Sequence, residues 1–471
     1  MNRWIRKLVA AAQWASFSIG FCNTASAQLA HSVESFRDPG VAAGAEASKV
    51  MLPHLRDERF WISGQTNFIF QAHPGFYAKY TGANSLVPNY EKATSRVMTL
   101  YTGVQLNNST EVLVHVEEAG GNGLSTALGI AGFSNLDAVR NPTLSASPYI
   151  ARVMMHKVFA LSGERKENDR GPMSIFPEVP VRRLELRAGK YGTADFFDQN
   201  SVGSDSHMQF MNWSTAQNGA YDYAADTRGY TWGAIAEYQD RRWALRFGES
   251  LMPQVANGLN MEWNLRKAHA ENLEYEFRQG FLPKRQGTIR LLGFLNHANM
   301  GVYRDAVGAY LSGQTTKPDI TAHPFKTTAK YGLGINMEQS LTRNFAAYAR
   351  YGWNDGKTES YAYTEIDSTI STGIGASGDR WRRTKDRAGV AFTSNAISSD
   401  HQKYLANGGL GFIIGDGGLR YGRENIFETY YTAHLWRGIF VAPDLQFVSN
   451  PAYNRDRGPV LIPGLRLHVD L

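Results

Sequence analysis

The sequence predicts an all-β protein, a transmembrane antiparallel β-barrel of about 16 strands with short helices in its loops. Three observations favour this fold. Charged and apolar residues alternate with period two in many segments, which in a strand places them on opposite faces. The polar faces carry long charged side chains, and aromatic residues lie near the segment ends. Beyond the N-terminus, no stretch approaches the roughly 20 apolar residues that a membrane helix needs.

The N-terminus is typical of a secretory signal peptide. A basic region, an apolar run over residues 8–21 and the A-x-A sequence Ala25-Ser26-Ala27 follow one another, so we expect cleavage after Ala27. The single cysteine, Cys22, lies inside residues 1–27, so the mature chain would hold no disulfide and no thiolate metal site. An exported chain of this size without cysteine suits the bacterial envelope.

Composition also fits a barrel. The formal net charge of +6 falls to +3 without the signal peptide, because that segment has three basic and no acidic residues. No basic stripe indicates nucleic-acid binding. The 46 glycines suit turns and bends, while 23 tyrosines, 24 phenylalanines and 10 tryptophans suit aromatic girdles at the membrane interfaces.

The domain organisation predicted after the signal peptide is simple. Residues 28–58 are polar and Ala-rich and lack a strand pattern, so we expect a lead-in segment that is partly helical. No change of composition interrupts the strand-like segments that follow. Residues 59–471 are therefore predicted to form one transmembrane β-barrel domain.

The strands follow from the alternation. Arg183, Glu185 and Arg187 oppose Leu184 and Leu186, for example. Five more segments alternate as clearly, at residues 111–117, 242–247, 273–278, 345–351 and 465–471. Ten further strand candidates cover residues 61–72, 95–106, 149–159, 231–239, 288–297, 328–340, 387–395, 410–414, 424–436 and 438–448. The total of 16 is even, as in closed antiparallel outer-membrane barrels.

Two loop helices and one long loop are also predicted. Residues 303–311 place apolar side chains at i, i+3, i+4, i+7 and i+8. Residues 399–406 have serine as a potential N-cap and Asn407-Gly408 as a stop signal. Residues 358–378 are rich in Gly, Ser and Thr, which favours an external loop.

The sequence holds few signals of enzymatic or cofactor chemistry. Residues 373–378 match G-x-G-x-x-G, but no βαβ unit surrounds them and Asp379-Arg380 follow in place of an apolar helix, which argues against nucleotide binding. The sequence lacks H-E-x-x-H, G-x-S-x-G and a P-loop. We therefore expect no enzymatic activity and no cofactor.

An acidic cluster between residues 195 and 226 is the best candidate for catalysis. It comprises Asp195, Asp198, Asp205, Asp222 and Asp226. Two of these carboxylates could form a glycosidase acid and base pair, which requires a separation on the order of 5–10 Å. They could also bind calcium. The interpretation that we favour is that they line an aqueous pore or support its loops.

Three aromatic residues in the same region, Trp213, Tyr221 and Tyr230, could stack on sugar rings. A sugar offers an apolar C–H face and many hydroxyls, so a sugar path needs aromatic platforms beside polar side chains. Packing of a loop explains the same residues equally well.

Several motifs follow one another along most of the mature chain. They are Phe60–Phe68, Glu118–Ser125, Ala131–Asn135, Arg187–Lys190, Asp195–Asp198, Asn212-Trp213, Asp226–Trp232, Tyr404–Gly411, Gly415–Gly417, Glu424, Glu428, Tyr430-Tyr431, Pro443–Gln446, Asn450-Pro451 and Arg457–Pro459. With these motifs the chain resembles the OprB-type carbohydrate-selective outer-membrane porins of Gram-negative bacteria. The resemblance implies a 16-stranded barrel among outer-membrane lipids that passes small sugars by diffusion, commonly as a homotrimer. The chain departs from the usual aromatic C-terminus and ends in Leu471, which the alternation places on the lipid-facing side.

Candidate pore-lining residues come from two sources. Strand parity selects Glu117, Arg152, Arg183, Glu185, Arg187, Arg246, Glu274, Arg350, Glu424 and Glu428. The segment from Asp195 to Arg228 is too long and polar for a simple turn, so we predict that it folds into or over the channel mouth and helps form the constriction. It contributes Asp195, Asp198, Asn200, Asn212, Trp213, Asp222, Asp226 and Arg228.

The expected function is passive, carbohydrate-selective diffusion of mono- or oligosaccharides into the periplasm. Mixed charges in one constriction favour a neutral polyhydroxy solute over an ion, and selectivity would depend on hydrogen-bonding groups that replace sugar hydration weakly. Three alternatives stay open: a general diffusion porin without sugar preference, an outer-membrane carbohydrate-active enzyme, and a secreted soluble β-protein that binds sugars.

Overall fold

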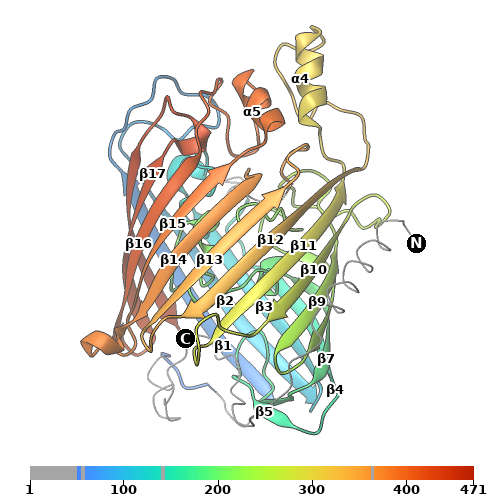
Figure 1. Ribbon diagram of the computed structural model, residues 1–471, viewed down its shortest axis with the longest axis vertical. Helices are drawn as coiled ribbons and strands as arrows, with labels where there is room; N and C mark the ends of the chain where they lie inside the picture. The colour runs from blue at the N-terminus through green and yellow to red at the C-terminus, as the bar shows by residue number, and fades with distance from the viewer. Residues whose placement is uncertain (1–49, 55–58, 139–143, 362–364) are drawn as a thin grey trace. The chain divides into compact units, whose positions relative to one another are not determined.

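Sixteen strands close into one antiparallel barrel within the residues that the structure describes, 50–54, 59–138, 144–361 and 365–471 (Figure 1). In this computed structural model each barrel strand pairs with the next one along the chain, and β1 closes on β18. The barrel strands are β1 (Phe60–His73), β2 (Glu91–Asn107), β3 (Thr110–Gly121), β4 (Tyr149–Ala160), β7 (Arg183–Tyr191), β8 (Thr231–Gln239), β9 (Trp243–Ser250), β10 (His269–Phe277), β11 (Gly287–Ala298), β12 (Thr328–Ser340), β13 (Phe345–Asn354), β14 (Ser368–Ser377), β15 (Arg387–Ala396), β16 (Glu424–Trp436), β17 (Ile439–Ser449) and β18 (Val460–Asp470). The fold class predicted from the sequence is confirmed.

The N-terminal predictions are largely beyond the described residues. The predicted signal peptide and its cleavage site lie outside them, and so does the predicted lead-in segment except for residues 50–54. Those five residues form neither helix nor strand. The backbone N–H of Met51 donates to the carbonyl oxygen of Asp470 over 2.8 Å, so the chain lies beside the end of β18 before it enters β1.

The remaining elements lie in the connections between barrel strands. A two-stranded ribbon forms between β5 (Arg165–Glu167) and β6 (Glu178–Pro180). The helical elements are η1 (Leu124–Thr126), η2 (Thr193–Asp195), α3 (Trp213–Ala216), α4 (Tyr303–Leu311), η3 (Gly378–Trp381), α5 (Ser399–Ala406) and η4 (Pro451–Tyr453). The two loop helices predicted from the sequence are confirmed as α4 and α5. Within the described part of the chain, no helix has the length and apolarity to cross a membrane.

The two ends of the barrel differ in the length of their connections. At the end that carries α4 and α5, connections such as residues 192–230 and 299–327 are long (Figure 1). At the other end, β8 meets β9 and β16 meets β17 through only a few residues, and the chain ends there at Leu471. Because outer-membrane barrels have short periplasmic turns and long external loops, we assign the α4 and α5 end to the cell exterior.

The alternation of the sequence becomes an outer apolar face and an inner polar face. On β16, Phe427 is 46% exposed, whereas its neighbour Glu428 is fully buried. At the C-terminus, Leu465 and Leu467 are exposed on the outside, and Leu471 continues that row. Apolar side chains outside and charged side chains inside reverse the pattern of a soluble protein and suit a barrel surrounded by lipid.

One strand prediction was missing and one was wrong, although the total was right. Residues 368–377 were assigned to an external loop, but they form β14. The strand is rich in small residues because its inner face packs against bulky side chains: a Cβ on Gly373 would lie 2.6 Å from Cε1 of Tyr348. The glycine motif at residues 373–378 thus spans the end of β14 and the start of η3.

Residues 410–414 were predicted to form a strand, and this prediction was wrong. They lie in the connection between α5 and β16. The backbone N–H groups of Ile413 and Ile414 both donate to Oε2 of Glu365, over 2.9 Å each, and both side chains are fully buried. The apolar run therefore packs the interior of a folded loop, where it has no strand neighbour.

Outward-facing apolar residues generate a stability prediction. Leu291 lies near the middle of β11, on the outer face, and is 49% exposed. The change Leu291→Arg should destabilise the barrel in lipid by about 2–4 kcal/mol, because it places a cation in the hydrocarbon layer. Denaturant titration of folding into phospholipid vesicles measures this free energy, with Leu291→Met as the matched control. Equal stability of the two variants would place this face outside the membrane.

Candidate functional site

The connection between β7 and β8, residues 192–230, folds into the barrel, and we call it the inner segment. Arg350 on β13 is 1% exposed and holds it from one side. Its Nε lies 2.7 Å from Oδ2 of Asp198, and its terminal nitrogens donate to the carbonyl oxygens of Asp198 (3.1 Å) and Thr215 (3.2 Å). Burial raises the pKa of Asp198, and the Arg350 guanidinium offsets this only in part.

Side chains from the last strands hold the middle of the inner segment. On β16, Oε1 of Glu428 accepts hydrogen bonds from the backbone N–H groups of Met211 (2.5 Å) and Asn212 (3.0 Å). On β18, Arg466 donates to the carbonyl oxygen of Gln209 over 2.7 Å. Charged side chains thus satisfy backbone groups that the irregular segment leaves without a ladder partner.

A third set of anchors comes from β12. The ammonium group of Lys330, which is fully buried, lies 3.1 Å from Oδ2 of Asp222. The side-chain amide of Asn200 donates to Oδ1 of Asn336 over 3.3 Å. Anchors on β12, β13, β16 and β18 together fix the inner segment against the wall opposite β7 and β8. The predicted inward fold of this segment is what the structure has.

Residues 122–138, in the connection between β3 and β4, also fold inward, and we call them the second inner segment. Glu424 on β16 accepts hydrogen bonds from the backbone N–H groups of Ala131 (2.9 Å) and Gly132 (3.3 Å). Phe133 then stacks on Trp213 of the inner segment, with ring centroids 5.3 Å apart and ring planes at 29°. The two segments therefore meet inside the barrel.

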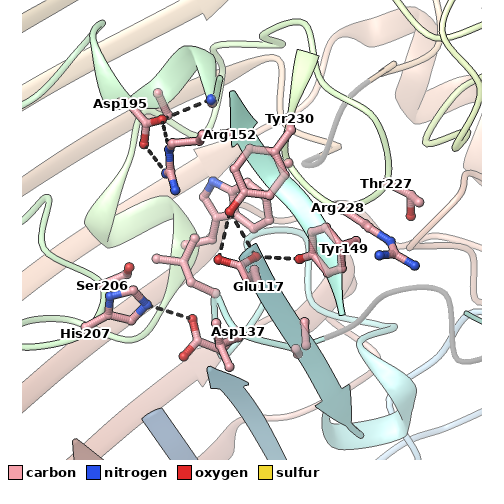
Figure 2. Close-up of a pocket in the computed structure, with 18 of the residues that line it drawn as sticks. Glu117, Asp137, Tyr149, Arg152, Asp195, Ser206, His207, Thr227, Arg228 and Tyr230 are labelled. Atoms are coloured by element: carbon pink, nitrogen blue, oxygen red, sulfur yellow. Dashed lines mark hydrogen bonds and ion pairs between the residues drawn. The ribbon is translucent and has the colours of Figure 1, made fainter. Parts of the chain in front are cut away.

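A cavity of about 230 Å³ lies between the two segments and the wall formed by β1 to β4 (Figure 2). We call it the inner cavity. Its polar lining carries both signs of charge, next to aromatic rings. The lining includes Gln65, Tyr101, Glu117, Phe133, Asp137, Tyr149, Arg152, Asp195, His207, Trp213, Gln217, Tyr223, Arg228 and Tyr230.

Two hydrogen-bonded groups organise the inner cavity. Glu117 on β3 accepts from the hydroxyls of Tyr149 (2.5 Å) and Tyr230 (2.9 Å), as Figure 2 shows. Burial, followed by the Glu117 carboxylate, raises the pKa of Tyr230 well above its usual value, so that hydroxyl stays protonated. Arg152 makes a bidentate pair with Asp195, in which both N···O distances are 2.7 Å. These groups are aligned before any ligand arrives.

A histidine and an aspartate join the two inner segments across the cavity. Nε2 of His207 lies 3.7 Å from Oδ1 of Asp137 (Figure 2). Burial alone would lower the pKa of His207, but the facing Asp137 carboxylate outweighs it and raises that pKa. Burial would raise the pKa of Asp137, yet His207 lowers it. The two groups therefore favour each other's charged form.

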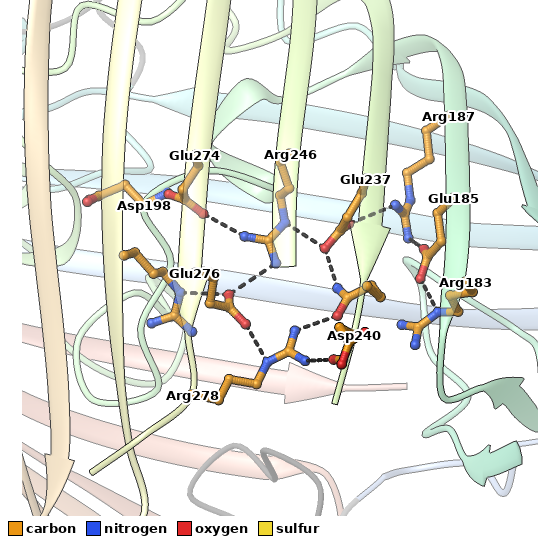
Figure 3. Close-up of polar contacts among 12 residues, drawn as sticks. Arg183, Glu185, Arg187, Asp198, Glu237, Asp240, Arg246, Glu274, Glu276 and Arg278 are labelled. Carbon is orange, nitrogen blue, oxygen red and sulfur yellow. Dashed lines mark hydrogen bonds and ion pairs between the residues drawn. The ribbon is translucent and has the colours of Figure 1, made fainter. Parts of the chain in front are cut away.

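Below the inner cavity, arginines and glutamates alternate around the inner wall from β7 to β12, and Figure 3 shows the part of this array around Arg246. We call this array the charge ladder. Arg246 lies at its centre and contacts Glu237 (2.7 Å), Glu274 (2.5 Å) and Glu276 (3.1 Å). The other members are Arg183, Glu185, Arg187, Arg278, Arg290 and Glu338. Each carboxylate of the array has an arginine beside it, which offsets part of its desolvation cost.

The structure divides the candidate residues predicted from the sequence into four sets. Those that line the inner cavity are Glu117, Arg152, Asp195, Trp213 and Arg228. Those in the charge ladder are Arg183, Glu185, Arg187, Arg246 and Glu274. Those that contact or form the anchored parts of the inner segments are Asp198, Asn200, Asn212, Asp222, Arg350, Glu424 and Glu428. Asp226 accepts from the backbone N–H of Arg228 (2.9 Å) and thus fixes its own turn. That all of them line the sugar path stays a prediction.

Among the cavity residues that sequence reasoning did not single out are Tyr149, Asp137 and His207. Tyr149 faces Glu117 across the β3–β4 pair, so a register assignment could have found it. Asp137 and His207 lie in irregular segments, where neither strand parity nor a motif marks a side chain. Their pairing depends on how the two inner segments meet in three dimensions.

The acidic cluster does not form a free carboxylate pair. Asp195, Asp198 and Asp222 each lie beside a cation, which is Arg152, Arg350 and Lys330 in turn. Within the described residues, no group of three or more His, Cys, Asp or Glu side chains could hold a metal ion. These ion pairs attach the loop that carries the carboxylates to the barrel wall.

The His207–Asp137 pair predicts a pH dependence. Because the pKa of His207 is raised, its contribution is complete below the ordinary histidine value of about 6.5, as long as Asp137 is ionised, and is lost as the pH rises through the raised value. Because the pKa of Asp137 is lowered, the same stabilisation is also lost as the pH falls through that lowered value. The change Asp137→Asn should bring the pKa of His207 down, measured by NMR titration of labelled histidine. Asp319→Asn, in a distant loop, is the control, and an unchanged His207 pKa in Asp137→Asn would contradict the assignment.

The Arg350 anchor predicts a change in pore width. Arg350→Gln leaves the buried Asp198 carboxylate without its cation, which in buried pairs costs about 3–5 kcal/mol. The loss should fall on docking of the inner segment, because the strand ladder is untouched. We expect higher single-channel conductance and faster proteolysis of residues 192–230, while the barrel keeps its heat-modifiable electrophoretic mobility. Arg437→Gln, at an exposed turn, is the control. Wild-type conductance in Arg350→Gln would show that the anchor does not set the pore width.

The same barrel architecture occurs in a solved porin structure. No curated protein matches the chain. Among solved structures, the high-pH structure of Pseudomonas putida OprB is similar with a TM-score of 0.66 and 15% identity, over 88% of this chain and 95% of that chain. The outer membrane channel DcaP of Acinetobacter baumannii has a TM-score of 0.46 and 8% identity, over 88% and 97%. The family model described as carbohydrate-selective porin, OprB family, matches residues 86–471. The chain therefore belongs to the OprB family of carbohydrate-selective porins of the outer membrane.

Proposed function

We propose that the inner cavity is the selective part of the sugar path through this outer-membrane porin. The observation that carries the proposal is the fixed pair of polar groups, Glu117 with its two tyrosines and Arg152 with Asp195, next to the rings of Trp213 and Tyr230. A sugar presents hydroxyls and an apolar C–H face, and this lining offers carboxylate oxygens, guanidinium N–H groups and aromatic faces.

The charge balance supports a neutral solute. Arg152 is paired with Asp195, and His207 lies beside Asp137, so the cavity offers hydrogen bonds with little net field. A sugar can exchange water for these groups and leave again, because every partner already has an internal contact and binds it weakly. In this proposal diffusion is passive and follows the concentration gradient toward the charge ladder and the periplasm.

Export and assembly belong to the proposal as well. We infer from the sequence that the chain is exported, is cleaved after Ala27, and inserts among outer-membrane lipids. The family resemblance supports a homotrimer. N-terminal sequencing of protein from outer membranes and sedimentation in matched detergent measure these properties, with a monomeric mass as the outcome that would exclude the trimer.

Sugar block of ion current tests the selective cavity. In planar bilayers, maltose or glucose at millimolar concentration should reduce the single-channel current. Glu117→Gln should weaken this block about tenfold, because a charge-assisted hydrogen bond to a carboxylate becomes a neutral one. Glu164→Gln, an exposed glutamate in a periplasmic turn, is the matched control.

Each alternative has a distinct outcome in the same preparation. No block by any sugar would favour a general diffusion porin. Block that is equal in wild type and Glu117→Gln would move selectivity away from the inner cavity. Release of reducing ends from added oligosaccharides would favour a carbohydrate-active enzyme.

A further inference from the structure

A second cavity, of about 420 Å³, opens on the outer wall of the barrel toward the end with the long connections. We call it the outer groove. Its lining is Tyr149, Ile150, Val153, Lys190, Asp226, Arg228, Trp232 and Leu259. Ile150 and Leu259 are 51% and 47% exposed, so the groove faces the surroundings of the barrel and not the lumen.

An interruption of strand pairing creates the outer groove. In the described chain, the pairing of β4 with β7 starts only at Val153 and Lys190, so residues 149–152 have no ladder partner on β7. Gly189 makes this departure possible: its φ of 136° is rare for other residues, and a Cβ there would lie 2.1 Å from the carbonyl oxygen of Val153. Nζ of Lys190 donates to the carbonyl oxygen of Ile150 over 2.9 Å and takes the place of a ladder bond.

Aromatic side chains place the outer groove at the membrane surface. Trp232, in the groove wall, lies beside Trp263, with ring centroids 5.8 Å apart, and Trp263 is 67% exposed. Tryptophans on the outer face of a barrel gather at the level of the lipid headgroups. The groove therefore spans the boundary between the headgroups and acyl chains of the outer leaflet.

The charge of the outer groove favours an anion. Lys190 and Arg228 supply two cations, and Asp226 supplies one carboxylate, 3.8 Å from the Lys190 ammonium group. That carboxylate already accepts the backbone N–H groups of Arg228 (2.9 Å) and Tyr230 (3.1 Å). The Arg228 guanidinium lies over the ring of Tyr149, 3.9 Å from its centroid, which fixes its position.

We propose that the outer groove binds a phosphorylated lipid of the outer leaflet. The phosphate lies between Lys190 and Arg228, which donate charge-assisted hydrogen bonds to its oxygens. An acyl chain lies along Ile150, Val153 and Leu259 toward the hydrocarbon layer. Since Arg228 lines both the outer groove and the inner cavity, the bound lipid also fixes one side chain of the sugar path.

Native mass spectrometry of the detergent-solubilised protein tests the proposal. The probes are dimyristoyl phosphatidic acid, dimyristoylglycerol, which lacks the phosphate, and inorganic phosphate, which lacks the chains. We expect one tightly bound phosphatidic acid, with an affinity about tenfold above that of dimyristoylglycerol. Lys190→Met should lower the phosphatidic acid affinity about tenfold, and Leu259→Glu, in an exposed loop that tolerates the change, should do the same.

Lys267→Met is the matched control, because Lys267 is an exposed lysine at the same end of the barrel. It should keep wild-type affinity, and millimolar inorganic phosphate should not displace the lipid. The proposal is overturned if dimyristoylglycerol binds equally well, if both groove variants keep wild-type affinity, or if Lys267→Met loses as much affinity as Lys190→Met. Displacement by inorganic phosphate would assign the groove to free phosphate instead.

Discussion

Closure of the barrel between β1 and β18 fixes everything else in this structure. Once the sheet has no edge, each strand has one face toward lipid and one toward the lumen, and period-two alternation decides which side chain goes where. The lumen then contains a concentrated set of charged groups. Their positions are fixed by the strand register, because a slip of one residue would move every side chain of the slipped strand to the opposite face of the sheet.

The inner segments supply hydrogen-bond partners for the charged side chains that barrel closure gathers in the lumen. An open lumen would leave Arg350, Glu424 and Glu428 facing water, whereas the segments bring backbone N–H and C=O groups to them. A buried charge is costly without a partner, and an irregular backbone is costly without a ladder. The charged side chains thus gain partners and the irregular backbone gains hydrogen bonds, so a narrow polar passage forms although the inner segments hold only short helical turns.

Much of the fold could be predicted from the sequence, because strand faces repeat with a fixed period. The strand period places Phe427 outside and Glu428 inside, and it places Leu467 and Leu471 on the same outer face. The helices α4 and α5 were predicted from helical signals instead. The strand β14 was not predicted, because it is rich in small residues and shows little alternation. Its small residues make room for Tyr348 on the neighbouring strand, a contact that no local sequence pattern indicates. In the site, Glu117 and Arg152 could be found by parity. His207 and Asp137 could not be found in this way, because both lie in loops outside the strands and their contact depends on how the two loops meet.

The anchors of the inner segment also imply an order of assembly. Its contacts join residues 76, 152, 217 and 260 positions apart in the sequence, and the partners lie on strands from β10 to β18. Contacts of such long range form late, after the intervening chain is ordered. We therefore expect the inner segment to dock only after the strands that carry its anchors are in place.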